Sequence, residues 1–301
     1  MKQGKQHQAD KITRAAHAKL NLFLHVVGRR DDGYHELESL FAFTKGGDLL
    51  SAELSDDLTL QVDGPFSASL NASGAATDNL VLRAAHSLKQ HARYNGGAAI
   101  RLTKNLPVAS GIGGGSADAA AALLILNQLW ALDMPHKELE GIALTLGADV
   151  PACLHTAPLM VGGIGENLTE TSLPKGYGIL LVNSGEGVST PAAFQKYHEE
   201  RVAYRAPLRT KAPSGSSNFI SWIVENTGND LTKPALDLCE TIADVLNALE
   251  TSEGALLTRM SGSGATCFAL FEGVAEAKQA QKTLAQEHPG WWMFADQLMP
   301  G

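Results

Sequence analysis

The sequence predicts an α+β protein, and two stretches carry that prediction. Around residues 100–126, an alternating strand pattern leads into a glycine-rich loop and then into an Ala/Leu/Ile run without Gly or Pro, which is typical of a buried helix. Residues 255–294 read strand, glycine turn, strand, helix, strand, the order of a split βαβ half-domain. The length of 301 residues fits two domains or one large domain.

Composition and charge narrow the class of protein. The chain is 44% hydrophobic and 19% charged, as expected for an ordinary globular protein. Its formal charge of −8 argues against a general nucleic-acid binder, which would carry a basic surface. A small anionic substrate held by a few local cations is still compatible with this charge.

The termini and cysteines predict the compartment. The polar start MKQGKQHQADK lacks the apolar core of a signal peptide, and no apolar run is long enough to span a bilayer. We therefore predict no membrane partner and expect the first ten or so residues to form a loose tail. Three scattered cysteines, none in a C-x-x-C pair, favour a reduced, cytoplasmic location.

The N-terminal part predicts strands and one helix. Alternation over 18–26 predicts a strand with Lys19 and Asn21 side by side on its polar face. A turn at 28–33 and a strand over 37–43 form a hairpin whose far limb begins with Tyr34 and His35. Both polar pairs are also compatible with an ordinary solvated strand. Further strands are expected near 49–54 and 58–62, and an amphipathic helix over 78–91.

The glycine loop is the first candidate binding site. Gly111, Gly113, Gly114 and Gly115 precede Ser116, where the helix is expected to begin. Glycines let a ligand approach the main chain closely, and the free N–H groups of a helix's first turn suit a phosphate. The alternative is a closely packed loop that binds nothing.

The rest of the chain adds an acidic residue and a second glycine turn. Asp149 follows a predicted helix over 135–146 and either caps the next helix or acts as a catalytic carboxylate. Beyond residue 158 we expect a turn at 162–166, a strand over 179–182 and a helix from about 188 onward that carries Phe194. A loop over 205–217 and a helix over 235–249 follow. The turn Ser261–Gly264 is an ordinary hairpin or, paired with the first loop, closes over a nucleotide.

Four motifs in order resemble the GHMP kinases. Residues 106–120, LPVASGIGGGSADAA, resemble the phosphate-binding motif of that superfamily, and 260–271, MSGSGATCFALF, resemble its C-terminal glycine motif. Residues 18–24 with 33–37, and 147–151, are similar to the branch that acts on a cytidine diphosphate-linked sugar alcohol. Departures from the usual motifs are His17, Ala109, Ile112, Ala117 and the pair Ala152-Cys153.

The resemblance implies a fold and an activity. The fold would be the two-domain GHMP kinase fold, with an ATP-binding domain over 12–156 and a substrate domain over 157–301. The first would hold a mixed sheet with helices and the second would be ferredoxin-like, with the active site in the cleft between them. The activity would be ATP-dependent phosphorylation of an alcohol on a cytidine diphosphate-linked sugar alcohol in isoprenoid biosynthesis. Mg²⁺ would assist, and the chain would be a monomer or homodimer.

The resemblance also implies roles for individual residues. Lys19 and Asp149 would be catalytic, with Asp149 as the base. ATP would be bound by the loop residues Pro107, Val108, Ala109, Ser110, Gly111, Ile112, Gly113, Gly114, Gly115 and Ser116, the last also contacting Mg²⁺. The substrate would be bound by Asn21, Tyr34, His35, Thr190, Phe194, Ser261, Gly262, Ser263 and Gly264.

Three other functions are compatible with parts of the sequence. A homoserine- or mevalonate-type kinase is disfavoured by Tyr34-His35 and by the strand that carries Lys19 and Asn21. A dinucleotide-binding oxidoreductase is suggested because Gly111-x-Gly113 opens a helix after a strand, but there is no early βαβ unit. A catalytically dead nucleotide sensor is disfavoured by the presence of Lys19 and Asp149.

Overall fold

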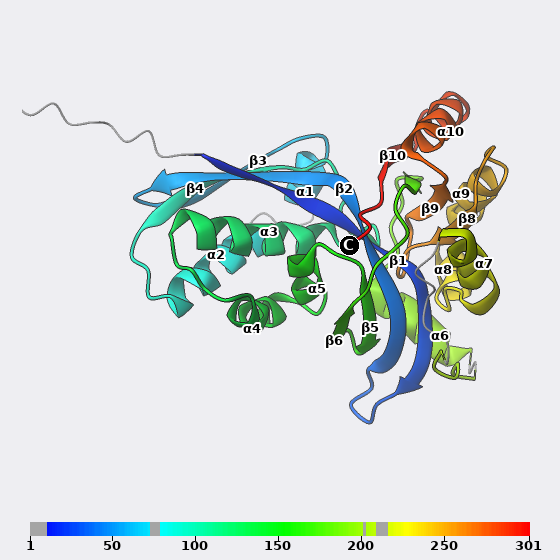
Figure 1. Ribbon diagram of the computed structural model, residues 1–301, viewed down its shortest axis with the longest axis horizontal. Coiled ribbons are helices and arrows are strands. Elements are labelled where there is room, and N and C mark those ends of the chain that lie inside the picture. Colours follow the sequence, from blue (N-terminus) through cyan, green and yellow to red (C-terminus); the bar gives the residue numbers. More distant parts are fainter. Residues whose placement is uncertain (1–10, 73–78, 201–202, 209–215) are drawn as a thin grey trace, which may run out of the picture. The chain divides into compact units, whose positions relative to one another are not determined.

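The protein is described by a computed structural model over residues 11–72, 79–200, 203–208 and 216–301 (Figure 1). The predicted N-terminal tail lies outside these residues. Its strands are β1 (Ile12–Arg29), β2 (His35–Ser55), β3 (Leu58–Asp63), β4 (Gly97–Thr103), β5 (Leu159–Gly163), β6 (Asn167–Glu170), β7 (Gly178–Asn183), β8 (Leu257–Met260), β9 (Cys267–Phe271) and β10 (Trp292–Gln297). Its helices are α1 (Ser67–Ala72), α2 (Leu80–His91), α3 (Gly114–Leu129), α4 (His136–Leu146), α5 (Val150–His155), α6 (Thr190–Glu199), α7 (Ser216–Asn226), α8 (Thr232–Leu238), α9 (Thr241–Glu250) and α10 (Val274–Glu287).

The chain forms two compact units, each built from segments that are distant in sequence. Unit 1 contains Asp48–Leu106 and Gly115–Leu154 together with the chain up to Ala16. Unit 2 contains His17–Gly47, Pro107–Gly114 and His155–Gly301. The division into domains at residues 156 and 157 stays a prediction.

Unit 1 packs helices against a sheet. In it, β4 pairs with β3 in parallel and with the Leu49–Ser55 part of β2 in antiparallel fashion. The core of the unit includes α3, in which every alanine is buried together with Leu123, Ile125 and Leu126, as expected for a largely apolar helix. Asn79 caps α2 by accepting a hydrogen bond from the Val81 N–H at 2.8 Å, which fixes where that helix starts.

Unit 2 contains a four-stranded antiparallel sheet in the order β10-β7-β9-β8. Numbered within this part of the chain, the order is four, one, three, two, which confirms the predicted ferredoxin-like arrangement. The helices α9 and α10 pack on this sheet, and Figure 1 draws these two helices in the yellow to red part of the chain. Their buried side chains form one core with β7 and β9.

Several predicted elements differ in extent from the observed ones. The strands expected over 37–43 and 49–54 are one strand, β2, which stays extended through Gly46 because Asp296 accepts the Gly46 N–H at 2.5 Å. The helix expected over 235–249 is two helices, because the extended backbone of Cys239 (φ −151°, ψ 93°) separates α8 from α9. Among the described residues, every helix is too short or too polar to cross a bilayer.

Candidate active site

The polar pair on β1 is buried, which excludes the solvated-strand interpretation. Lys19 is 4% exposed and Asn21 is 3% exposed. The Lys19 ammonium donates a hydrogen bond to Asn21 Oδ1 at 3.2 Å and lies 4.2 Å from the centre of the Phe41 ring. The Asn21 amide donates to Ser39 Oγ at 2.9 Å. Buried polar groups need such partners, so neighbouring residues fix the orientation of both side chains.

The first glycine loop touches β1 directly. The Lys19 N–H donates to the Ile112 carbonyl at 3.0 Å. Gly113 has a φ of +62°, and a Cβ there would lie 3.1 Å from the Lys19 side chain. Gly111 has a φ of +78°, and a Cβ there would lie 2.6 Å from the Gly264 carbonyl oxygen. These two glycines are therefore required by backbone conformation and by close packing.

The helix after the loop begins at Gly114, earlier than the predicted start at Ser116. The N–H groups of Gly114, Gly115 and Ser116 therefore belong to its first turn, where no carbonyl four residues earlier can accept them. The Ser116 side chain is half-buried and carries a hydroxyl oxygen. Such an oxygen fits the ligand preference of Mg²⁺.

The second glycine turn joins the loop to β1 within unit 2. The Ser261 hydroxyl donates to the Gly111 carbonyl at 3.0 Å and accepts the Asn21 N–H at 3.2 Å. The Thr266 N–H donates to the Ser110 carbonyl at 3.1 Å. The turn is thus not an isolated hairpin, because its first serine connects the loop and the strand that were predicted to work together.

Two aromatic rings predicted to hold a base are stacked on each other. The rings of His35 and Phe194 have centroids 5.2 Å apart and planes inclined by 20°, and Tyr197 meets His35 edge-on. Burial, with Arg29 and His198 nearby, lowers the pKa of His35, so this imidazole is neutral at pH 7. Tyr34 is 63% exposed.

Two more predicted substrate residues meet on α6 and the second turn. The Thr190 hydroxyl lies 2.7 Å from the Ser263 hydroxyl. A hydrogen bond therefore connects the start of α6, the helix that carries Phe194, to the glycine turn.

Asp149 belongs to unit 1, directly before α5. Its carbonyl accepts the Cys153 N–H at 3.2 Å, as the residue that begins a helix does. Capping and catalysis both stay open for its carboxylate, because one position can serve both.

Unit 1 contains a buried ion cluster that sequence reasoning missed. Lys104 pairs with Asp48 and, at 2.7 Å, with Asp118 in α3. Asp48 Oδ1 also accepts the N–H groups of Asn105 and Leu106, at 2.5 and 2.8 Å. Burial raises the pKa of Asp118, and the two carboxylates raise that of Lys104 against its own burial. The available signal was Asp48 itself, a charged residue in phase with the apolar face of its strand.

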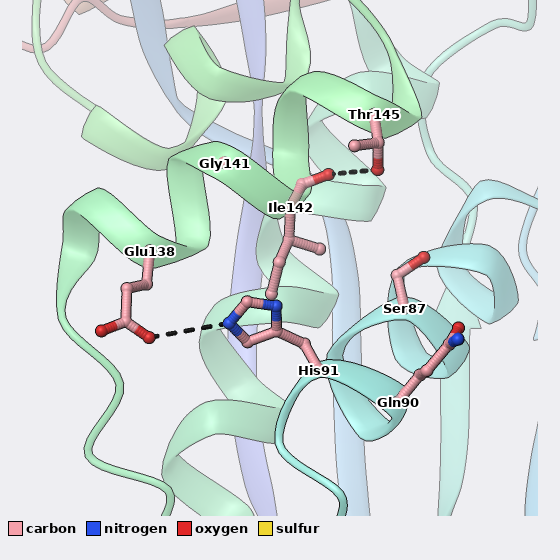
Figure 2. A pocket seen from close by; sticks show the side chains of 7 residues that line it. All are labelled: Ser87, Gln90, His91, Glu138, Gly141, Ile142 and Thr145. Carbon is pink, nitrogen blue, oxygen red and sulfur yellow. Dashed lines mark hydrogen bonds and ion pairs between the residues drawn. The ribbon is translucent and has the colours of Figure 1, made fainter.

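A cavity of about 560 Å³ lies elsewhere in unit 1, between α2 and α4. Figure 2 shows its lining, in which Glu138 points toward His91 at 3.7 Å. The lining residues are Ser87, Gln90, His91, Glu138, Gly141, Ile142 and Thr145. None of them is a predicted site residue, so this cavity is separate from the site described above.

Family models match both parts of the chain. The model described as GHMP kinases N terminal domain matches residues 79–157, and the one described as GHMP kinases C terminal matches residues 217–290. These ranges contain the first glycine loop, Asp149 and the second glycine turn.

Curated relatives match over nearly the whole length. A protein of Parvibaculum lavamentivorans named 4-diphosphocytidyl-2-C-methyl-D-erythritol kinase is 45% identical over 94% of this chain and 96% of its own. Proteins of that name from Ruegeria pomeroyi (48% identity, 92% and 95% coverage) and Brucella melitensis (44%, 98% and 98%) also match. The chain belongs to the 4-diphosphocytidyl-2-C-methyl-D-erythritol kinase family. It is therefore a member of the ATP-dependent GHMP kinases.

Solved structures agree with membership of the 4-diphosphocytidyl-2-C-methyl-D-erythritol kinase family. A crystal structure of a 4-(cytidine 5'-diphospho)-2C-methyl-D-erythritol kinase superposes with a TM-score of 0.79 at 32% identity, covering 96% of this chain and 100% of that one. A mevalonate kinase of L. major superposes with a TM-score of 0.67 at 15% identity, covering 98% and 99%. The second likeness shows the fold alone.

Proposed function

We propose that the chain transfers the γ-phosphoryl group of ATP to the 2-hydroxyl of 4-diphosphocytidyl-2-C-methyl-D-erythritol. The products are the 2-phosphate and ADP, on the methylerythritol phosphate route to isoprenoid precursors. Relatives of that name support the reaction. One structural observation carries the assignment of the site, namely the Ser261 hydroxyl that joins the first glycine loop to the strand bearing Lys19 and Asn21.

In this proposal the first loop binds the triphosphate. Main-chain N–H groups from Gly111 to Ser116 hold the β- and γ-phosphates, with the positive end of the α3 dipole behind them. Pro107–Ser110 shape the entrance to the loop, and Ser116 is the residue that would contact Mg²⁺. A bound Mg²⁺ supplies neutralisation of phosphate charge. The Lys19 ammonium stabilises negative charge on the transferring group.

The proton and the phosphoryl group move as follows. Asp149 takes the proton of the 2-hydroxyl while the oxygen of that hydroxyl bonds to the γ-phosphorus. The bond from the γ-phosphorus to the β–γ bridging oxygen breaks, which releases ADP. Asn21, held by Ser39 and by Lys19, positions the sugar alcohol. Positioning and charge stabilisation contribute most in this chemistry.

The His35–Phe194 stack is the proposed base-recognition surface. Cytosine stacks on these rings, with the exposed Tyr34 closing over it. Thr190, joined to Ser263, binds the diphosphate or diol part of the substrate, and Ser261–Gly264 line the reacting centre. Aromatic faces bind bases strongly without demanding a ligand of one shape.

Product analysis tests the reaction. The purified protein is incubated with ATP, Mg²⁺ and the cytidylyl sugar alcohol, and the new phosphate is located by mass spectrometry and phosphorus NMR. We expect one phosphoryl group, on the 2-hydroxyl. Homoserine and mevalonate serve as competing acceptors, and a higher kcat/KM with either would replace the proposed substrate.

The three cysteines support the proposed cellular compartment. Cys153, Cys239 and Cys267 are all thiols, with no disulfide between them, which supports a reducing, cytoplasmic location. A monomer or a homodimer stays the expectation for the oligomeric state, and light scattering measures it.

A further inference from the structure

The side chain of Asn229 is hydrogen-bonded to the main chain around the second glycine turn. It stands shortly before α8, outside every motif that the sequence suggested. Its Nδ2 donates to the carbonyls of Met260 and Gly262, both at 2.8 Å, and these two carbonyls flank Ser261. Its Oδ1 accepts the Leu231 N–H at 2.9 Å. Both donors and the acceptor are therefore used, and only one orientation of the amide satisfies them.

Arg259 lies in β8, two residues before the second turn begins, and its side chain anchors that strand. One of its terminal nitrogens donates to the Leu22 carbonyl at 3.0 Å and to the Thr227 hydroxyl at 2.7 Å. The other donates to the carbonyls of Ile223 and Thr227, each at 2.7 Å. Burial lowers the pKa of Arg259 to about 10, so the guanidinium is charged at neutral pH. It joins β8, the end of α7 and the strand β1 beside Asn21.

The main chain around Asn229 is itself bound to β1. The Leu24 N–H donates to the Gly228 carbonyl, and the Asp230 N–H donates to the Leu24 carbonyl, both at 2.9 Å. The Asp230 carboxylate also accepts the Val26 N–H at 2.9 Å. The segment 227–230 thus lies between β1 and the glycine turn and is hydrogen-bonded to both, so we call it the bracket.

We propose that Asn229 and Arg259 are positioning residues for phosphoryl transfer. Through the bracket they set the spacing between β1 and the second turn, and that spacing allows the Ser261 hydroxyl to bond Asn21 and Gly111 at once. The inference rests on the proposed function, because it assigns the role of the Ser261 contacts to catalysis. A displacement of about 1 Å at a reacting centre lowers a rate by about 10²-fold.

The substitution Asn229→Asp isolates this role. Aspartate keeps the size of asparagine and the acceptor for the Leu231 N–H, but it replaces the two donors by an oxygen that faces the carbonyls of Met260 and Gly262. Asn226→Asp is the matched control. Asn226 also donates its amide to a carbonyl, that of Trp222 at 2.9 Å, but on the exposed surface of α7.

Steady-state kinetics with both substrates are measured at a temperature where circular dichroism shows each variant folded. For Asn229→Asp we expect kcat to fall about 10- to 100-fold, with each KM changed by less than about threefold. Asn226→Asp keeps the wild-type kcat. Asn229→Ala, which removes both donors without adding charge, carries the same expectation and replaces the aspartate variant if that one does not fold.

The outcomes distinguish a failure of the positioning role from a failure of the proposed function. If the wild type and Asn226→Asp phosphorylate the substrate and the folded Asn229 variants do so at the same kcat, the positioning role is wrong. A loss of activity that only follows the unfolded fraction would also overturn it. If the wild type itself does not phosphorylate the cytidylyl substrate, the proposed function fails instead.

Discussion

At the scale of single residues, Lys19 and Asn21 show how polar groups are kept inside a core. Burying an ammonium group costs free energy unless partners replace its water. Here the Asn21 side chain and the face of Phe41 provide part of that replacement, and Ser39 fixes Asn21 in turn. Because of these contacts the Lys19 ammonium group has a fixed position and orientation, which suits a group that stabilises charge on a transferring phosphoryl group.

The base assignment predicts a large effect of one substitution. Asp149→Asn removes the proton acceptor while keeping the size of the side chain, so kcat should fall about 10²- to 10⁴-fold. ATP binding, measured by calorimetry, should be unchanged. Asp244→Asn, at an exposed aspartate of α9, is the control and should keep full activity. An Asp149→Asn variant with near wild-type kcat would leave capping as the role of this residue.

The stacking assignment predicts a binding effect instead. Phe194→Ala removes one of the two rings proposed to hold the cytosine, a loss of about 1–3 kcal/mol. The KM for the cytidylyl substrate should therefore rise about 5- to 150-fold, with the KM for ATP unchanged. A rise in the KM for ATP of the same size would instead place Phe194 near the triphosphate.

At the scale of elements, the first glycine loop is shaped by contacts that a side chain would break. A Cβ at Gly111 would lie 2.6 Å from the Gly264 carbonyl oxygen, with φ at +78°. Gly111→Ala should therefore raise the KM for ATP at least about tenfold, because the loop must move from the second turn. By contrast, a Cβ at Gly141, in α4, would meet nothing within 4 Å.

Gly141→Ala is thus the matched control for the loop. Alanine in an exposed helix interior is favoured over glycine by about 1 kcal/mol, so this variant should unfold about 1–2 °C higher with unchanged kinetics. If Gly111→Ala binds ATP as tightly as Gly141→Ala does, the loop is not the phosphate site.

The sequence predicted elements well where a local pattern determines them. The alternation over 18–26, the glycine loop and the strand–turn–strand–helix–strand order of the C-terminal part are confirmed. The sequence could not show that β2 runs unbroken through Gly46, because the partner that fixes this extended backbone is Asp296, 250 residues away. The roles of Asn229 and Arg259 could not be predicted for the same reason, since long-range hydrogen bonds to main-chain carbonyls leave no periodic pattern in the sequence.

At the scale of the whole molecule, a buried histidine couples the stability of unit 2 to pH. His25 accepts the Gly228 N–H at Nε2, and its Nδ1 is buried with no partner among the described residues. Burial and the nearby Arg205 and Arg259, against Asp230, lower its pKa to about 4. The unfolded chain, with a histidine pKa near 6.5, therefore binds this proton more readily than the folded chain does.

The direction in which folding stability changes with pH follows from this difference in pKa. Folding stability from this group is complete above about pH 6.5 and is lost as the pH falls toward 4. Between pH 7 and pH 5 the wild type should lose about 2 kcal/mol relative to His25→Gln, which keeps an acceptor but does not titrate. Urea unfolding at the two pH values measures this. Equal losses for the two proteins would mean that the pKa of His25 is the same in the folded and the unfolded chain.

The hydrogen bond between Asn21 and Ser261 spans 240 residues of sequence. A ribosome adding about 5–20 residues per second needs roughly 12–48 s to make that much chain. During this interval β1 already has a backbone partner, because it pairs with β2, the next strand in the chain. The contact of its polar face with Ser261 can form only after the second turn has been synthesised.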